Sequence, residues 1–289
     1  MEVFLVLVYP MIAALIHWNI SPEITKLFGV FPVRYYGLLF AMGIAAAYYV
    51  MARIYKKEGI PPEQFERLAI YTILGTFIGA RLGHFIFYQP EYFWKAPIEI
   101  FLPIAKIDGA YRFVGFGGLA SHGGTLGILI AIILYCRKTK LGFLWVVDRL
   151  AIVAPLTSAF IRIGNFMNSE IIGKPTGEGY GIIFQRVDNL PRHPAQLYEA
   201  VSYLVIFCVM LFLYQKNNRP SGFMFGIFLI LLFSARFCIE FFKEDQVAFE
   251  QGMALNMGQW LSIPFILAGI ALALYKNKPT PATVSLTTD

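Results

Sequence analysis

Five ionisable side chains of this sequence stand within long apolar runs, where charged residues are rare. They are Arg81, His122, Arg162, Arg236 and Glu240. A charge inside a membrane span is costly unless it is paired or meets water, so each residue is a functional candidate. For a single arginine, snorkelling to the interface or a structural salt bridge is the alternative. Three arginines together favour a phosphate site, because forked guanidinium donors match phosphate oxygens.

Two of these positions have a sequence context that narrows their roles. Arg236 and Glu240 are four residues apart and share a helical face, so they form a plain ion pair or one in which Glu240 orients Arg236 toward a ligand. His122 stands between Ser121 and Gly123. Histidine is readily poised as a base near neutral pH, although a lone intramembrane histidine can equally be a hydrogen-bonded packing residue.

A polar stretch follows the apolar run that ends near Arg162. It contains two amides, one carboxylate and a glycine at Asn165, Asn168, Glu170 and Gly173. The stretch either belongs to a site at the lipid–water boundary or is an ordinary capped helix end. Gln196 and Glu199 open the next apolar run, where a local helix cap is the alternative to a functional role.

The elements that position these residues follow from composition. The chain is 57% hydrophobic and 15% charged, whereas soluble domains carry about 25% charged residues. Runs near the roughly 20 residues needed to span a bilayer occur near 34–53, 68–88, 115–136, 144–163, 194–214, 222–243 and 257–275. We therefore predict an all-α polytopic protein of about seven transmembrane helices, with residues 1–289 forming a single integral membrane domain.

Basic residues near alternate connections predict the orientation. They are Arg53, Lys56, Lys57, Arg67, Arg137, Lys138, Lys140, Lys216, Arg219, Lys276 and Lys278. The positive-inside rule places them in the cytoplasm, with the N-terminus outside and the C-terminus inside. The loops 89–114, 164–193 and 244–256 then form a small extracytoplasmic head. Residues 1–17 are expected to be a retained apolar segment at or in the interface.

This topology predicts a shared depth for the candidates. Tyr36 and the five ionisable residues all fall within roughly 10 Å of the outer interface, from a rise of about 1.5 Å per residue. Only Glu240 and Glu170 are expected to offset the arginines. The sequence therefore predicts a cationic phosphate pocket that faces the outer leaflet.

Several motifs together resemble the prolipoprotein diacylglyceryl transferase family. They are Tyr36-Gly37, Gly79-x-Arg81-x-Gly83, Ser121-His122-Gly123-Gly124, Arg162-x-Gly-Asn165-Phe-x-Asn168-x-Glu170-x-x-Gly173, Arg192-His193-Pro194-x-Gln196-Leu-Tyr198-Glu199, Arg236-x-x-x-Glu240-Phe-Phe and Gly258-Gln259-x-Leu-Ser262-x-Pro264. The resemblance implies a seven-span enzyme of the bacterial inner (cytoplasmic) membrane. Such an enzyme moves the diacylglyceryl group of phosphatidylglycerol to the lipobox cysteine of a prolipoprotein, forming a thioether and releasing glycerol phosphate. Leu232 and Lys243 depart from the pattern, in which Tyr and Arg are common.

The resemblance also suggests roles for individual residues. The catalytic candidates are His122 as the base, Arg162 and Arg236 on the phosphate, and Glu240 orienting Arg236. The candidates for binding phosphatidylglycerol are Arg162, Asn165, Asn168, Glu170, Gly173, Tyr36, Arg81 and Arg236. The expected partners are phosphatidylglycerol, prolipoprotein signal peptides and the lipid bilayer. No metal, cofactor or nucleic acid is expected, and a chelator should make no difference to activity.

Two other functions agree with the same polar residues. One is a different phosphatidylglycerol-consuming membrane transferase, which would not need a cysteine peptide. The other is an anion transporter, a class that often has inverted repeats and a site at the bilayer midplane. This sequence shows no repeat, and its polar set is predicted near the outer interface. A structural membrane subunit would leave the buried arginines unexplained.

Overall fold

A computed structural model describes most of the chain. The described residues are 15–27, 31–102, 104–107, 109–114, 118–177, 179–216, 219–244, 250 and 252–275. Most of the apolar segment 1–17 lies outside the described residues, as do Gly117, Lys276 and Lys278 and parts of the loops 89–114 and 244–256.

Six helices of the described chain are long and apolar enough to cross a membrane. They are α2 (Tyr35–Lys57), α3 (Pro62–Tyr88), α7 (Phe143–Asn168), α8 (Ala195–Gln215), α9 (Phe223–Ile239) with the short 3-10 helix η1 (Glu240–Phe242), and α10 (Met257–Leu274). The predicted polytopic helical membrane protein is therefore confirmed. The remaining predicted span, 115–136, overlaps α6 (Ser121–Thr139), which is not among these six. The count of seven stays a prediction.

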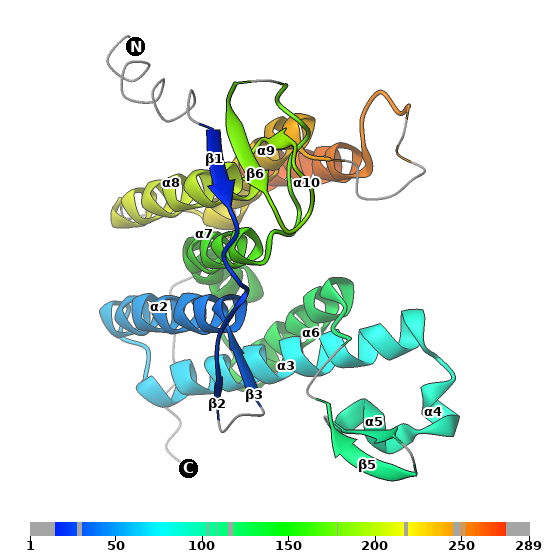
Figure 1. The fold of residues 1–289 in the computed structure, drawn as a ribbon. Coiled ribbons are helices and arrows are strands. Elements are labelled where there is room, and N and C mark those ends of the chain that lie inside the picture. Colours follow the sequence, from blue (N-terminus) through cyan, green and yellow to red (C-terminus); the bar gives the residue numbers. More distant parts are fainter. Residues whose placement is uncertain are drawn as a thin grey trace. The chain divides into compact units, whose positions relative to one another are not determined.

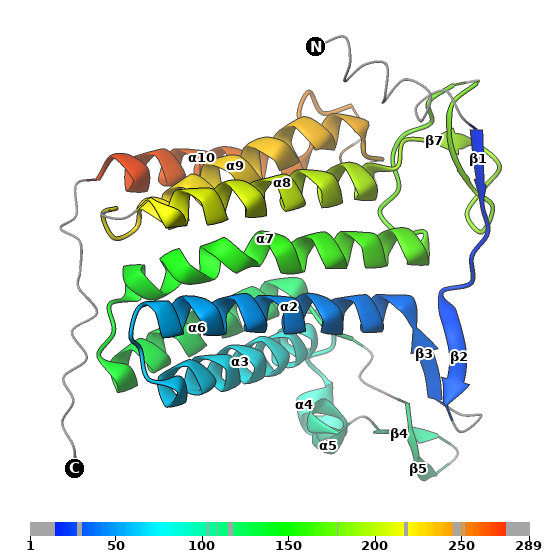
Figure 2. The ribbon, with the colours of Figure 1, turned by 90° about the vertical axis from the view of Figure 1, so that its left-hand side faces the viewer.

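The chain divides into two compact units. Among the described residues, the first unit comprises those up to Met51 together with those from Asp148 onward, and the second comprises those from Ala52 to Val147. Within the first unit, α2, α7, α8, α9 and α10 run side by side (Figure 2). Their directions alternate, so the N-terminal ends of α2, α8 and α10 meet the C-terminal ends of α7 and α9. Residues far apart in the sequence are thereby gathered at one end of these helices.

Short strands, which the sequence analysis did not predict, lie at this end of the first unit (Figure 2). They are β1 (Leu15–Trp18), β2 (Glu23–Leu27), β3 (Phe31–Arg34), β6 (Gly181–Phe184) and β7 (Pro191–Arg192). β1 pairs in parallel with β6 (Figure 1), and β7 completes that sheet; β2 and β3 form an antiparallel hairpin. The Trp18 and Phe166 ring centroids are 4.4 Å apart. The sheet therefore packs directly on the C-terminal turn of α7.

The second unit is built on α3 and α6, two helices whose backbones approach each other closely. Its remaining elements are α4 (Tyr92–Lys95), α5 (Pro97–Phe101) and the hairpin β4 (Ile104–Ile107) and β5 (Ala110–Phe113). Gly79 of α3 faces Gly123 and Gly127 of α6, and a Cβ on any of them would overlap backbone of the facing helix. Small residues let helix backbones approach this closely in a membrane. The glycine after His122 is thus explained by helix packing.

Replacing Gly123 by alanine is expected to destabilise the second unit by about 1–3 kcal/mol, because the added methyl group overlaps the Gly79 carbonyl oxygen. Gly124→Ala is the matched control, since a Cβ there would lie 3.5 Å from Ala80 Cβ, an ordinary contact. Thermal unfolding in detergent compares the two variants. Equal unfolding temperatures would show that the backbones do not meet as described.

Candidate active site

The polar stretch after α7 forms a continuous set of side-chain contacts. Arg162 Nη1 donates to Asn165 Oδ1 at 3.3 Å, and Asn165 Nδ2 donates to Glu170 Oε2 at 3.3 Å. Asn168 Nδ2 donates to the other oxygen, Oε1, at 3.0 Å. Gln196 Nε2 holds the Glu170 carbonyl oxygen at 2.6 Å. The structure thus brings together four of the predicted site residues and links them to the start of α8.

The backbone after α7 reverses through an uncommon conformation. Ser169 and Ile171 have φ of 57° and 56°, the left-handed region that a β-branched residue rarely adopts. The reversal returns the Glu170 carboxylate toward Asn165 and Asn168. Gly173 then passes so close to the His193 carbonyl that a Cβ would overlap it. Gly173 is therefore accounted for by close backbone packing, and its predicted contact with phosphatidylglycerol stays a prediction.

A buried arginine fastens this loop to two neighbouring segments. Arg192 Nη1 donates to the Gly173 carbonyl at 3.1 Å and lies 3.1 Å from Glu244 Oε2. Its Nε donates to Asp188 Oδ2 at 2.9 Å. This hydrogen bond holds the pKa of Asp188 below its usual range. Arg192 therefore ties the turn after β6, the loop after α7 and the segment after η1 to one another.

Acid is expected to weaken this contact. Because the folded-state pKa of Asp188 is lowered, the Asp188–Arg192 pair stabilises the fold above the usual carboxyl pKa of about 3.9, and that stabilisation is lost as the pH falls through the lower folded value. Between neutral pH and about pH 3, the unfolding temperature of the unchanged protein should fall further than that of Asp188→Asn. Parallel curves for the two proteins would argue against the pair.

Glu199 is the direct partner of Arg162. Its Oε2 lies 2.9 Å from Arg162 Nε, and its side chain is 0% exposed. The Tyr203 hydroxyl, one turn further along α8, also interacts with the Arg162 guanidinium. The cap of α8 at Pro194 has no side-chain hydrogen bond. Glu199 is therefore no local helix cap but a buried counter-charge for the arginine.

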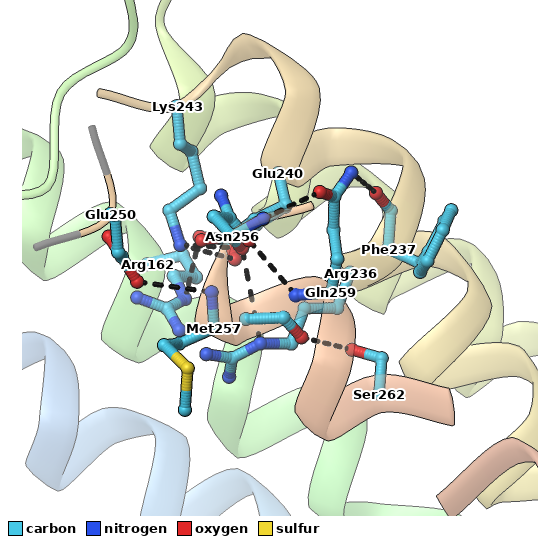
Figure 3. Close-up of polar contacts among 12 residues, drawn as sticks. Arg162, Arg236, Phe237, Glu240, Lys243, Glu250, Asn256, Met257, Gln259 and Ser262 are labelled. Atoms are coloured by element: carbon cyan, nitrogen blue, oxygen red, sulfur yellow. Dashed lines mark hydrogen bonds and ion pairs between the residues drawn. The ribbon is translucent and has the colours of Figure 1, made fainter. Parts of the chain in front are cut away.

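A second group of charges lies at the end of α9. Lys243 Nζ donates to Glu240 Oε2 at 3.1 Å, and the same oxygen lies 4.0 Å from Arg236 Nε (Figure 3). Lys243 Nζ is also 3.8 Å from Glu199 Oε1. The charges of Arg162, Glu199, Lys243, Glu240 and Arg236 thus alternate along one row, which we call the ion-pair chain. It joins α7, α8 and α9.

The start of α10 supports Glu240 from the other side. A Cβ on Gly258 would lie 2.6 Å from the Glu240 carboxyl carbon, so only glycine leaves room for this carboxylate. Asn256 and Gln259 form a reciprocal capping box at the same helix start (Figure 3). A carboxylate near a helix N-terminus is favourably placed for the helix dipole. Glu240 is thus closely packed against α10 and lies 4.0 Å from Arg236 Nε, while its role in orienting Arg236 toward a ligand stays a prediction.

A polar cavity of about 260 Å³ adjoins Glu240. Its lining includes Glu240, Glu250, Asn256, Gln259 and Lys174. Glu250 Oε1 accepts a hydrogen bond from the Met257 amide at 3.1 Å (Figure 3). The cavity is thus a small polar space beside the Glu240 end of the ion-pair chain.

Tyr36 joins this site from the first turn of α2. A Cβ on Gly164 would lie 2.9 Å from the Tyr36 ring, so the absence of a side chain there allows the ring to pack on α7. The Tyr36 hydroxyl interacts electrostatically with Glu170 and Arg162. Tyr36 therefore packs on α7 two residues after Arg162, beside the polar stretch with which it is predicted to act.

Two predicted residues belong to the second unit. Arg81 Nε donates to the Ile100 carbonyl at 2.9 Å and Nη2 to the Glu99 carbonyl at 2.6 Å, which indicates a role in fastening the segment after α4. Its proposed contact with phosphatidylglycerol stays a prediction. His122 is exposed in the first turn of α6, as a base that meets a substrate requires.

Sequence reasoning underestimated the negative charge of the site. It counted Glu240 and Glu170 against the arginines, whereas Glu199 is fully buried against Arg162. It also treated Lys243 only as a departure from a family pattern. The available signal was the spacing of three residues between Glu240 and Lys243, which puts both on one side of a helical turn.

The fold and this geometry define a polytopic membrane protein in which partly exposed arginines are paired with buried carboxylates where its helix ends converge. The sequence model of the family described as prolipoprotein diacylglyceryl transferase matches residues 22–275. A protein of Bacteroides fragilis named phosphatidylglycerol–prolipoprotein diacylglyceryl transferase is 50% identical over 266 residues, covering 91% of this chain and 96% of its own. Proteins of the same name from Tolumonas auensis and Nitrosomonas europaea are 49% and 38% identical, over 91% and 94% of this chain and 98% and 97% of theirs. The chain therefore belongs to the prolipoprotein diacylglyceryl transferase family.

Proposed function

We propose that this chain transfers the diacylglyceryl group of phosphatidylglycerol to the lipobox cysteine thiol of prolipoproteins. The products are a thioether-linked lipid and glycerol phosphate, and the reaction is the first step of bacterial lipoprotein maturation. Family membership and the names of its relatives support this activity. We place the protein in the bacterial cytoplasmic membrane, with the N-terminus outside and the C-terminus in the cytoplasm, because of its basic connections.

The observation that carries the proposal is the ion-pair chain that joins α7, α8 and α9. Arg162 on α7 and Arg236 on α9 are held by carboxylates that are 0% and 4% exposed, while the arginine side chains keep 17% and 35% of their surface. Glu199 holds the Arg162 guanidinium at 2.9 Å, and Glu240 lies 4.0 Å from Arg236, so both cations stand beside a buried carboxylate before the reaction begins. Two fixed cations with exposed surface suit the phosphate of a lipid head group.

The chemistry is a displacement at carbon. The cysteine sulfur attacks the glycerol carbon that bears the phosphate ester, and the carbon–oxygen bond breaks. The bonding electrons go to the phosphate oxygen, whose charge grows as glycerol phosphate leaves. Arg162 and Arg236 would stabilise this charge more strongly in the transition state than in the ground state.

The remaining candidates serve the nucleophile and the head group. A free thiol has a pKa of about 8.5 and is mostly protonated at neutral pH, so we assign His122 to accept the thiol proton. Glu240 orients Arg236. The head group is assigned to Tyr36, Arg81, Asn165, Asn168, Glu170 and Gly173.

Purified protein, phosphatidylglycerol and a lipobox peptide test this function by mass spectrometry of the peptide. We expect a diacylglyceryl adduct on the cysteine, and no adduct on a matched peptide with serine in its place. Loss of phosphatidylglycerol without an adduct would instead indicate a different lipid transferase. Flux of a labelled anion into proteoliposomes, without an adduct, would indicate a transporter.

A further inference from the structure

The centre of the ion-pair chain is a lysine whose side chain is buried as deeply as the carboxylates around it. Lys243 is 3% exposed, and its Nζ lies 3.1 Å from Glu240 Oε2 and 3.8 Å from Glu199 Oε1. Removing water from an ammonium group is costly unless opposite charges compensate it. The two carboxylates supply that compensation, so Lys243 and its two partners are mutually dependent.

Each of these carboxylates also holds an arginine. Glu199 Oε2 contacts Arg162 Nε at 2.9 Å, and Glu240 Oε2 contacts Arg236 Nε at 4.0 Å. At Glu240 a single oxygen faces both cations, and the lysine is the nearer one. Lys243 therefore competes with the arginines for their carboxylates and weakens the hold of Glu240 on Arg236.

The net charge of the ion-pair chain depends on Lys243. The ion-pair chain contains three cations, Arg162, Lys243 and Arg236. Its two carboxylates are those of Glu199 and Glu240, so it has a surplus of one positive charge. A phosphodiester carries one negative charge. Without Lys243 the two arginines would be matched by the two buried carboxylates, and the attraction for an anion would fall.

The backbone fixes the lysine in this position. Residue 243 forms an isolated β-bridge with Gly173. On either side of it, the Lys174 amide donates to the Phe242 carbonyl at 2.8 Å, and the Glu244 amide donates to the Ile172 carbonyl at 3.3 Å. The loop that follows Glu170 therefore holds the segment that carries Lys243.

We propose that Lys243 is a positioning residue that occupies Glu199 and Glu240 and so keeps the charge of Arg162 and Arg236 available for the phosphate of the lipid substrate. Lys243 acts through the arginines and does not itself touch the substrate. This inference rests on the proposed function and assigns a task to a residue that departs from the family pattern.

The test uses full-length Lys243→Met, Lys243→Gln, Lys243→Arg and the double variant Lys243→Met/Glu199→Gln. Transfer rates are measured against phosphatidylglycerol concentration at saturating lipobox peptide. We expect the KM for phosphatidylglycerol to rise about tenfold or more in Lys243→Met and Lys243→Gln, because each leaves the two buried carboxylates to neutralise Arg162 and Arg236. Lys243→Arg keeps the charge and should remain near the unchanged protein. The double variant should recover part of the lost affinity, since it removes the surplus carboxylate.

A merely structural lysine would give a different pattern. The unfolding temperature and the yield of active protein would then fall while the KM for phosphatidylglycerol stayed constant, and Glu199→Gln would not help. That pattern overturns the inference.

If Lys243→Met fails to fold, the comparison of Lys243→Gln with Lys243→Arg still decides the inference, because a charge effect predicts a higher KM for phosphatidylglycerol in Lys243→Gln than in Lys243→Arg. Absence of any peptide adduct with the unchanged protein would refute the proposed function itself, independently of the lysine variants.

Discussion

Replacing Arg162 by glutamine is expected to reduce diacylglyceryl transfer at least about a hundredfold, as removal of one preorganised donor to a developing anion does in other enzymes. Arg162 is anchored to Glu199 at 2.9 Å and to Asn165 at 3.3 Å, so its charge is fixed in place before substrate binds. Glutamine keeps a hydrogen-bond donor but lacks the positive charge and the forked N–H donors of the guanidinium group. The substitution also removes the nearer cation from the buried Glu199 carboxylate and leaves Lys243 at 3.8 Å from it.

The measurement is the rate of adduct formation, followed by mass spectrometry at several phosphatidylglycerol concentrations. Arg137→Gln is the control, because Arg137 is exposed in the last turn of α6. Turnover by Arg162→Gln within a few-fold of that control would remove Arg162 from the chemistry.

Replacing His122 by glutamine is expected to lower kcat by about a hundredfold or more, the usual contribution of a general base. The KM for phosphatidylglycerol should change little, since His122 is assigned to the thiol and not to the phosphate. The loss should shrink as the pH rises toward the thiol pKa of about 8.5, because solvent then supplies the thiolate.

The neighbouring Ser121→Ala serves as the control for His122→Gln, since both residues are exposed in the first turn of α6. Rates are compared across the pH range at saturating lipid and peptide. A loss of the same size at every pH would speak against a base, and an unchanged rate would exclude the histidine altogether.

The helices were predictable because a membrane span needs only a sufficiently long apolar run. The predicted run 194–214 and the observed α8, Ala195–Gln215, differ by one residue at each end. α6 was harder to place, because its start at Ser121 is small and polar. α6 approaches α3 closely because glycines of the two helices face each other, and a single sequence does not show which glycines will do so.

The loop after α7 was predictable from residue types, since Asn165, Asn168 and Glu170 are unusual beside an apolar run. Both asparagines donate hydrogen bonds to the Glu170 carboxylate, while the binding of phosphatidylglycerol by these residues stays a prediction. Glu199 and Lys243 could not be assigned in the same way. Each becomes a site residue only because α8 and the end of α9 converge on Arg162. The spacing of Glu240 and Lys243 indicates their local pairing, but no local spacing indicates their convergence with Glu199 and Arg162.

The short strands were missed for a related reason. β1 and β6 are four residues each, and their segments show no regular alternation of polar and apolar residues by which a strand is recognised. Their pairing joins Leu15 to Gly181. A contact over such a separation is a property of the assembled chain.

That pairing sets an order for biosynthesis. During translation, β1 precedes α2 and leaves the ribosome long before β6 exists, so its edge waits unpaired while α2, α3, α6 and α7 are made. Contacts between distant segments form late because loop closure must precede them. The sheet beside Phe166 therefore cannot close before α2, α3, α6 and α7 have been made. A nascent chain that stalls before Gly181 would contain α7, with Arg162, but would lack the sheet of β1, β6 and β7 that packs on the C-terminal turn of α7.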